Sequence, residues 1–205
     1  METPPPKPSP SFDAYSPTEI AARVASAGVT KASLPFLQMF ILALLASAFI
    51  AFGSMLFTLV MTHHGLGFGP SRLLGGFALS LGLVLVVVAG AELFTGNNLI
   101  VMAWAERKVS SAQLLRNWGI VFVGNIAGSV GIAFLVFWSG TLNLNNGGVA
   151  ETAISIASAK VAIPPAEAFF RDLLCNTLVC LAVWLCFAAH SLTDKVIAIV
   201  FPITA

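Results

Sequence analysis

The chain has 205 residues, of which 58% are hydrophobic and only 9% charged, and its formal net charge is +1. A soluble domain carries about 25% charged residues, so this composition excludes an ordinary soluble globular domain. It predicts an all-α polytopic protein of the lipid bilayer. Basic patches with interleaved aromatic residues are absent from the sequence, so nucleic acid is not an expected partner.

Residues 1–30 are expected to form a cytoplasmic N-terminal tail. They lack the apolar core of a signal peptide. Residues 1–15 are rich in proline, which favours an extended or disordered segment. The sequence Ser-Pro-Thr-Glu at residues 16–19 supplies a helix N-cap, a proline at the first helical position and a glutamate that completes a capping box. It predicts a short amphipathic helix over residues 17–27, lying at the membrane surface or, alternatively, in solvent, and Gly28 is expected to terminate it.

Residues 31–205 are expected to form one transmembrane domain. A spanning helix needs about 20 predominantly apolar residues. The expected spans are residues 35–61, 72–105, 114–138, 166–189 and 196–205. The last of them offers about half a span, so we expect a C-terminally truncated sequence.

The loop after the first span carries two adjacent histidines, His63 and His64. They lie in a glycine-rich turn with no third ligand nearby in the sequence, so no metal site is expected there. The cysteines Cys175, Cys180 and Cys186 share one apolar segment. They show neither metal-ligand spacing nor a disulfide pattern, and we interpret them as small apolar core residues. No cofactor is expected.

The second span, residues 72–105, is interrupted by Gly90, Glu92 and the polar run Thr95-Gly96-Asn97-Asn98. A helix that breaks at membrane depth leaves backbone N–H and C=O groups unpaired, and lipid cannot satisfy them. Such breaks face protein or a water-filled path, and transporters often bind ions there. The stretch is therefore predicted to belong to a conduction path.

Two bulky residues in the break, Leu93 and Phe94, are candidates for an apolar constriction that resists hydrated ions by dewetting. Ordinary packing is the alternative for both side chains. A bare anion would be strongly disfavoured between them, whereas a protonated weak acid would not. Coupling of passage to proton transfer is therefore physically favourable.

The residues after this pair are expected to begin a second half-helix. Its N-terminal amides, those of Gly96, Asn97 and Asn98, suit an anion because helix N-termini carry partial positive charge. The hydroxyl group of Thr95 is expected to cap this half-helix.

Glu92 is a carboxylate deep in apolar sequence. Intramembrane ionisable groups are candidates for function, but a negative charge does not suit the lining of an anion path. We therefore expect a structural role, in which Glu92 accepts hydrogen bonds from the unpaired backbone amides of the break.

The third span contains the sequence Gly124-Asn125-Ile126-Ala127-Gly128, a GxxxG step that favours close helix packing. Within it, Asn125 is polar at membrane depth, so it needs a hydrogen-bond partner on another helix. In the fourth span, Asn176 is expected either to donate a hydrogen bond to a passing acid or to tie helices together.

Residues 139–165 are expected to form a long polar loop. It holds one basic residue, Lys160, and a run of turn-forming residues: Asn143, Asn145, Asn146, Gly147 and Gly148. A lysine at the mouth of a path can raise the local concentration of anions. An ordinary solvated lysine is the alternative.

Basic residues are distributed unevenly between the two sides that the alternating spans define. One side holds Lys7, Arg23, Lys31, Arg107, Lys108, Arg116 and Lys195, and the other holds Arg72, Lys160 and Arg171. Basic residues favour the cytoplasmic side. The bias predicts a multi-pass protein of the inner (plasma) membrane with a cytoplasmic N-terminus.

Dispersed motifs in this chain resemble the signature of the formate/nitrite transporter family. They are Gly90-Ala91-Glu92-Leu93-Phe94-Thr95-Gly96-Asn97, Asn117-Trp118, Gly124-Asn125, Asn176 with Val179-Cys180-Leu181-Ala182-Val183-Trp184, and Ser191-Leu192-Thr193-Asp194-Lys195. The likeness runs from about residue 14 to the end, in order and with the expected spacing.

The resemblance implies an aquaporin-like helical bundle of six spanning segments and a homopentamer with a pore in each protomer. It implies transport of small monovalent weak-acid anions, formate or nitrite first, and sometimes hydrosulfide, lactate or acetate. The broken second helix of the family narrows the cytoplasmic side, and Leu93, Phe94 and Thr95 match that segment. Lys160 matches a lysine of the periplasmic vestibule, with the same spacing to Asn176.

The chain departs from the family pattern at its C-terminal end. The family has a second broken helix, which carries a phenylalanine constriction and a central histidine, followed by a sixth helix. Here the sequence ends at residues 201–205, before these features. The alternative functions are therefore a nonconducting truncated subunit and a channel for another small solute, such as hydrosulfide or lactate. An intramembrane enzyme has little support, because Glu92 and His190 are far apart in sequence and have no third partner.

Overall fold

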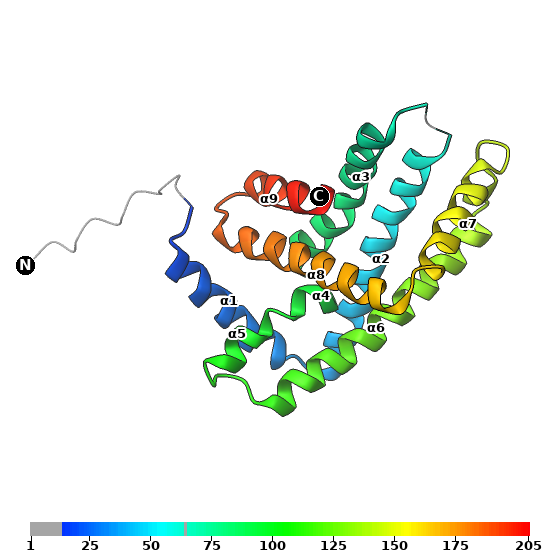
Figure 1. Ribbon diagram of the computed structural model, residues 1–205. Coiled ribbons are helices and arrows are strands. Elements are labelled where there is room, and N and C mark those ends of the chain that lie inside the picture. Colours follow the sequence, from blue (N-terminus) through cyan, green and yellow to red (C-terminus); the bar gives the residue numbers. More distant parts are fainter. Residues whose placement is uncertain (1–13, 64) are drawn as a thin grey trace, which may run out of the picture.

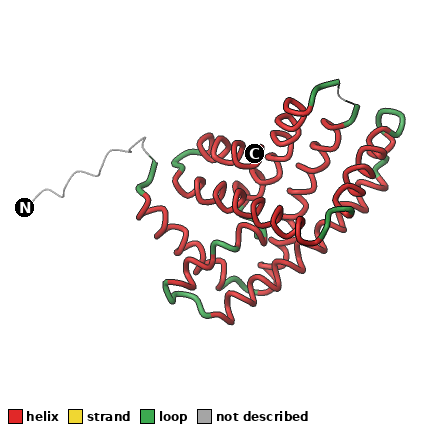
Figure 2. The backbone as a smooth tube through the Cα atoms, viewed as in Figure 1, coloured by secondary structure: helices red, strands yellow, loops and turns green. Residues whose placement is uncertain are grey.

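The computed structural model describes residues 14–63 and 65–205, and every regular element in this part of the chain is helical (Figures 1 and 2). The predictions for residues 1–13 and for His64 lie outside the described residues. The helices are α1 (Pro17–Ala32), α2 (Phe36–Met61), α3 (Phe68–Ala89), α4 (Phe94–Asn97), α5 (Ile100–Ala105), α6 (Ser111–Trp138), the 3-10 turn η1 (Thr141–Asn143), α7 (Gly148–Val161), α8 (Pro165–Ala188) and α9 (Leu192–Thr204).

Within the described residues, the helices long and apolar enough to cross a membrane are α2, α3, α6 and α8. Many of the large apolar side chains on their outer faces are exposed, as lipid-facing surfaces require. The expected fold class, an all-α membrane protein with a broken second span, is therefore confirmed. α6 and α9 begin earlier than predicted, because Ser110 and Ser191 form capping boxes with Gln113 and Asp194.

The N-terminal helix begins as predicted but ends later. Ser16 and Glu19 form the expected capping box. The predicted end at residue 27 was wrong, since α1 continues through Gly28 to Ala32. Gly28 serves close packing rather than termination: a Cβ atom there would lie 3.0 Å from the Cβ atom of Ala103 in α5. α1 thus lies against the segment that follows the helix break.

The prediction of a long polar loop over residues 139–165 was also wrong. η1 and the 14-residue helix α7 occupy most of it, and α7 turns back after the end of α6 and contacts α2 (Figure 1). The turn residues are confined to the start, where Asn145, Asn146 and Gly147 all have positive φ. The alanine-rich run after them favours a helix. Lys160 therefore lies in the last turn of α7 rather than in a loop.

α2 packs closely against both α3 and α6. The GxxxG prediction is confirmed: a Cβ atom on Gly124 would lie 2.6 Å from the Cβ atom of Ala43, and one on Gly128 would lie 2.5 Å from the carbonyl oxygen of Leu44. On the other side of α2, Gly53 approaches the backbone of α3 in the same way. These three helices form a rigid support for the break between α3 and α4.

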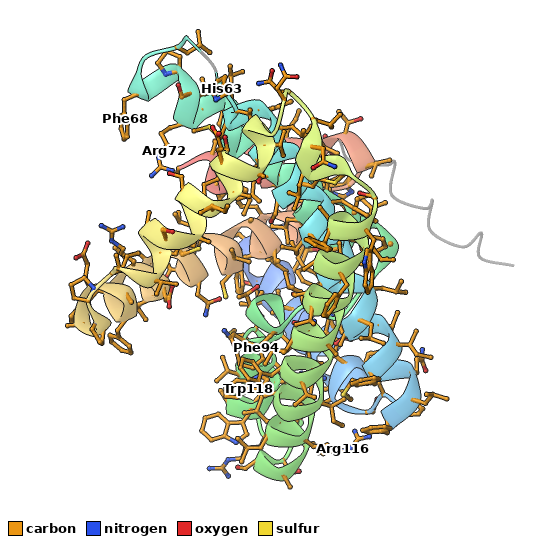
Figure 3. The ribbon with its side chains drawn as sticks, turned by 90° about the vertical axis from the view of Figure 1, so that its right-hand side faces the viewer. His63, Phe68, Arg72, Phe94, Arg116 and Trp118 are labelled. Atoms are coloured by element: carbon orange, nitrogen blue, oxygen red, sulfur yellow. The ribbon has the colours of Figure 1, made fainter. Side chains whose placement is uncertain are left out.

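α8 and α9 complete the described part of the bundle. α8 lies across the long helices in Figure 1, and α9 returns from its end to pack against α3. Ile199 of α9 is fully buried and joins the core cluster of Leu83, Val86 and Ala182. Figure 3 shows the two ends of the bundle: His63, Phe68 and Arg72 lie at one end, and Arg116 lies at the other.

Candidate functional site

The break in the second span is built around Gly90. α3 ends at Ala89, and Gly90 adopts a left-handed conformation with φ of 75°. The backbone N–H groups of Gly90 and Ala91 both donate to the carbonyl oxygen of Val86, at 3.0 Å each. Helices commonly end in this way at glycine. The chain then runs extended to Leu93 before α4 begins, as the sequence predicts.

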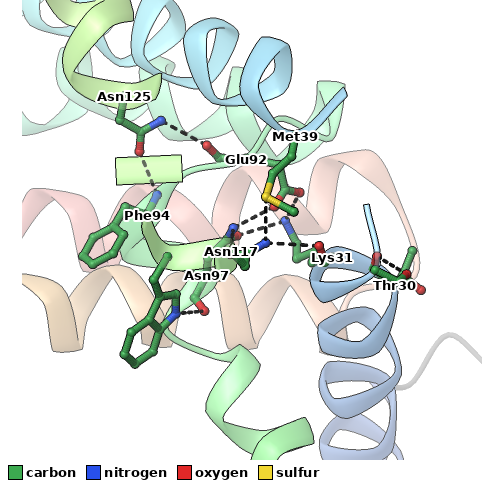
Figure 4. A network of polar contacts seen from close by, with 10 residues as sticks. Thr30, Lys31, Met39, Glu92, Phe94, Asn97, Asn117 and Asn125 are labelled. Carbon is green, nitrogen blue, oxygen red and sulfur yellow. Dashed lines mark hydrogen bonds and ion pairs between the residues drawn. The ribbon is translucent and has the colours of Figure 1, made fainter. Parts of the chain in front are cut away.

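Backbone N–H and C=O groups that the helix break leaves unpaired form hydrogen bonds with residues of α2 and α6 (Figure 4). The side chain of Asn125 donates to the carbonyl oxygens of Ala43 (2.8 Å) and Glu92 (3.1 Å) and accepts from the N–H group of Phe94 (2.9 Å). The N–H group of Glu92 donates to the carbonyl oxygen of Leu42 at 3.2 Å. The expectation that Asn125 has a partner across helices is confirmed.

The carboxylate of Glu92 has different hydrogen-bond partners from those predicted. It accepts from the ammonium group of Lys31 at 2.6 Å and from the side-chain amide of Asn97 at 2.7 Å. The predicted bonds from backbone amides of the break were wrong, because Asn125 and Leu42 take those positions. Glu92 is only 2% exposed. Lys31 thus supplies the opposite charge that a buried carboxylate requires.

A polar network extends from this ion pair (Figure 4). Lys31 also donates to the side-chain oxygen of Asn97 at 3.1 Å, and Asn97 donates to Asn117 at 3.0 Å. Asn117 returns a hydrogen bond to the carbonyl oxygen of Lys31 at 3.1 Å. The indole N–H group of Trp118 donates to the carbonyl oxygen of Asn97 at 3.1 Å. The network fixes α1, the break and α6 relative to one another.

A cavity of about 230 Å³ lies beside the break, between α1, α3, α8 and α9. Of the residues predicted for the path, it is lined by Leu93, Gly96 and Asn97. Most of its wall is aliphatic, and its charged side chains are Arg23, Lys31 and Lys195. Since Glu92 neutralises Lys31, the lining carries a net positive charge and suits a small anion.

A second cavity, of about 250 Å³, lies along α8, where Asn176, Thr177 and Cys180 form its polar edge. The thiol of Cys180 donates to the carbonyl oxygen of Thr95 at 3.4 Å. Leu99 lines both cavities. The junction between α4 and α5 therefore separates a cavity with cationic side chains in its wall from an uncharged cavity whose wall is mostly apolar.

Other predicted site residues lie elsewhere. Phe94 lines neither cavity and packs edge-on against the rings of Trp118 and Phe122, with centroid distances of 6.2 and 5.4 Å (Figure 3). The prediction that Thr95 caps the half-helix was wrong: Thr95 lies inside α4, whose N-cap residue is Leu93. Asn98 and Lys160 line neither cavity.

The sequence analysis assigned Arg23 and Lys31 only to the charge bias between the two sides, and Lys195 to that bias and to the motif at residues 191–195. They belong to two short helices, α1 and α9, which were not expected to reach the break. A signal was present for Lys31, since Val24, Gly28 and Lys31 follow helical spacing and therefore share a face. For Lys195, the motif at residues 191–195 marked the residue but not its place beside the break.

Comparison with known proteins shows that the chain is similar to formate/nitrite transporters. Residues 18–205 match the sequence model of formate/nitrite transporters. The chain is 37% identical over 193 residues to the formate channel FocA of Escherichia coli (strain K12), covering 94% of this chain and 68% of the relative. It is 35% identical over 197 residues to the formate channel BtFdhC of Bacillus thuringiensis, covering 93% and 74%.

Solved structures agree with this comparison. A pentameric formate channel with formate bound superposes with a TM-score of 0.75 at 37% identity, covering 82% of this chain and 67% of that one. An FNT family ion channel superposes with a TM-score of 0.82 at 27% identity, covering 91% and 75%. The chain is thus shorter than these relatives.

Proposed function

The chain belongs to the formate/nitrite transporter family, a family of transport proteins rather than enzymes, and from this premise we propose that it conducts small monovalent weak-acid anions. Formate or nitrite is the first candidate substrate, and hydrosulfide and lactate are the alternatives. The proposal includes a homopentamer with a path in each protomer. Its support is the similarity to formate channels and to a pentameric one in particular.

The observation that carries the proposal is the cavity beside the helix break. Its cationic side chains attract an anion from bulk water. Its aliphatic wall disfavours a bare charge that has lost its hydration. The cavity therefore concentrates the anion. Beyond it, at the apolar constriction that Leu93 adjoins, a weak acid passes most easily in its neutral, protonated form.

Two further residues belong to the proposed path. Asn176 lines the cavity on the other side of Leu99, where its amide is able to donate to a passing acid. Lys160, exposed in the last turn of α7, attracts anions to the opposite mouth. Phe94 supports the break by packing against α6 rather than by lining the path.

Orientation is part of the proposal. Arg116 lies at one end of the bundle and Arg72 at the other (Figure 3). The end with Arg116 also carries the short loop with Arg107 and Lys108. The positive-inside rule makes this end cytoplasmic in the plasma membrane. The N-terminus then lies in the cytoplasm, and the cationic cavity opens toward that side.

The test is anion flux in proteoliposomes that contain this 205-residue chain. Formate, nitrite, hydrosulfide and lactate are offered separately across a pH step. We expect flux that rises as the outside is acidified and that falls in Lys160→Ala, while Lys108→Ala, in an exposed ion pair with Glu106, leaves it unchanged. Absence of flux for all four solutes from a correctly assembled protein would contradict the proposal and favour a nonconducting subunit.

A further inference from the structure

Arg23 and Lys195 stand out among the cations of the described chain, because both line the cavity and neither forms an ion pair with a carboxylate of the described residues. Three other lysine and arginine residues of the described chain have carboxylate partners: Lys31 with Glu92, Lys108 with Glu106, and Arg171 with Glu167. Within the described residues, the guanidinium of Arg23 and the ammonium of Lys195 have no carboxylate within 4 Å. Their charges are available to a ligand.

Arg23 does have a carboxylate one turn earlier on α1, but that group is already engaged. Glu19 accepts from the backbone N–H group of Ser16 at 2.8 Å and from the Ser16 hydroxyl group at 2.7 Å. These bonds hold the pKa of Glu19 below its ordinary value, with a smaller contribution from Arg23. Glu19 therefore completes the capping box instead of neutralising Arg23.

The guanidinium of Arg23 is positioned by an aromatic ring. It lies 4.0 Å from the ring centroid of Tyr15. That ring stacks on His190 with centroids 4.1 Å apart, and the Tyr15 backbone N–H group donates to the carbonyl oxygen of Ala188 at 3.3 Å. A cation–π contact orients the guanidinium without using its N–H donors. Arg23 is therefore held at the cavity with its hydrogen-bonding capacity intact.

We propose that Arg23 and Lys195 form an anion-capture site for small monocarboxylates at the mouth of the cavity, with Tyr15 as the residue that positions Arg23. Lys31 is a separate group, since Glu92 and Asn97 occupy its donors. The identification of the captured anion as transported substrate rests on the proposed function. The site itself rests on the cavity and on the two uncompensated charges.

The dimensions and walls of the cavity define the ligand class. A volume of about 230 Å³ corresponds to about seven or eight waters at about 30 Å³ each. Val24, Ala27, Val87 and Phe187 supply apolar surface beside the two cations. This combination fits a carboxylate group with a short aliphatic tail, so that lactate and propionate bind at the same site as formate.

The first experiment measures the concentration dependence of formate flux from each face of oriented proteoliposomes. Removing one charge at about 4 Å in a water-like medium corresponds to about a fivefold loss of affinity. We expect Arg23→Gln and Lys195→Gln each to raise KM from the cavity face about fivefold, with additive effects and an unchanged maximal flux. KM from the opposite face stays at the wild-type value.

The matched control is Arg72→Gln, an exposed arginine at the other end of the bundle that lines neither cavity (Figure 3). It leaves KM from the cavity face unchanged. An unchanged KM in the double variant, or an equal rise from both faces, would overturn the capture site.

A second experiment separates the capture site from the transport proposal. Line broadening of ¹³C-formate by the detergent-solubilised protein reports binding without flux. Broadening that is present in the wild type and lost in the Arg23→Gln, Lys195→Gln double variant supports the site, even if the wild type proves nonconducting. Equal broadening by both proteins at matched gel-filtration profiles would refute the site, even if the wild type conducts.

The role of Tyr15 has its own readout. Tyr15→Phe keeps the ring and is expected to keep the wild-type KM, whereas Tyr15→Ala raises KM toward the Arg23→Gln value. In the Arg23→Gln background, Tyr15→Ala should have no further effect. An additive effect in that background would contradict a positioning role.

Discussion

Glu92 and Lys31 show how a single ion pair ties the N-terminal helix to the break. The carboxylate is almost fully buried, whereas the side chain of Lys31 is 31% exposed. A buried pair contributes little compared with an apolar pair of the same shape, but removing one partner is costly, because the other charge is left uncompensated. We therefore expect the pair to act mainly on the specificity of assembly, by favouring the register in which α1 meets the break.

The first prediction concerns this charge. Glu92→Gln is expected to destabilise the protein by about 1–3 kcal/mol, less than the loss of a fully buried pair because water reaches Lys31. Thermal unfolding of the detergent-solubilised protein measures it, with Glu106→Gln in an exposed pair as the control. Normal stability and assembly combined with altered anion selectivity would contradict a structural role for Glu92.

Asn125 carries the second prediction at this scale. Its replacement by alanine leaves the N–H group of Phe94 and the carbonyl oxygens of Ala43 and Glu92 without these partners. An unsatisfied buried group costs about 1–3 kcal/mol, so Asn125→Ala should lower the unfolding midpoint substantially. Ser129→Ala is the matched control, since its hydroxyl group bonds only within α6 in the described structure. Equal midpoints for the two variants would show that the break does not depend on Asn125.

At the scale of elements, close crossings and capped ends determine where each helix lies. α2 meets α6 at Gly124 and Gly128, where the backbones touch. α1 and α9 begin at capping boxes whose acids are Glu19 and Asp194. A capping box and a GxxxG step are each recognisable within one short stretch of sequence. A helix crossing also requires the partner helix to place small side chains or backbone atoms opposite the glycines.

The crossing gives a prediction with an internal control. Gly128→Val forces a branched side chain against the backbone of Leu44, and overpacking of this kind costs about 1–3 kcal/mol. Gly131→Ala, one turn along the same helix, meets no atom within 4 Å. It should be neutral or stabilising, since alanine favours helix over glycine by up to about 1 kcal/mol. Thermal midpoints compare the two, and the reverse order would contradict the crossing.

The capped ends predict a dependence on pH. Hydrogen bonds from Ser16 hold the pKa of Glu19 below its ordinary value, and hydrogen bonds from Ser191 do the same for Asp194. A depressed pKa means that these caps contribute stability above the ordinary carboxyl pKa of about 4 and lose it as the pH falls through the lower folded value.

We therefore expect the first turns of α1 and α9 to fray below about pH 4. Hydrogen exchange, normalised to the intrinsic rate at each pH, measures this fraying. In Glu19→Gln, protection of α1 should no longer vary with pH over this range. Persistent variation in that variant would exclude Glu19 as the group responsible.

At the scale of the whole molecule, the outer surface remains strongly apolar. Phe122, Phe134 and Trp138 on α6 and Phe169 and Leu174 on α8 are all more than half exposed. Such surface is stable against lipid or against further copies of the chain. Native mass spectrometry from lipid nanodiscs is expected to detect a pentamer, as in the similar solved channel. A monomer under these conditions would contradict the proposed assembly.

Much of the fold was predictable because its signals are contiguous in the sequence. Apolar runs of spanning length predicted α2, α3, α6 and α8. Gly90 and the polar residues after it predicted the break, and the box at residues 16–19 predicted the start of α1. The errors arose where one local signal was given too much weight. Gly28 was interpreted as the end of α1, which continues to Ala32, and the asparagine and glycine residues near 145–147 were interpreted as evidence for a loop that extends to residue 165.

The candidate site was only partly predictable. The positions of Leu93, Gly96 and Asn97 depend on the helix break. The sequence alone determines that break, through the length and hydropathy of the second span and through Gly90. The partners of Glu92, the donors to the break and the cations of the cavity come from helices far apart in the chain. Only tertiary packing brought them together, because distance in space between such residues depends on how helices cross and not on any spacing within one segment.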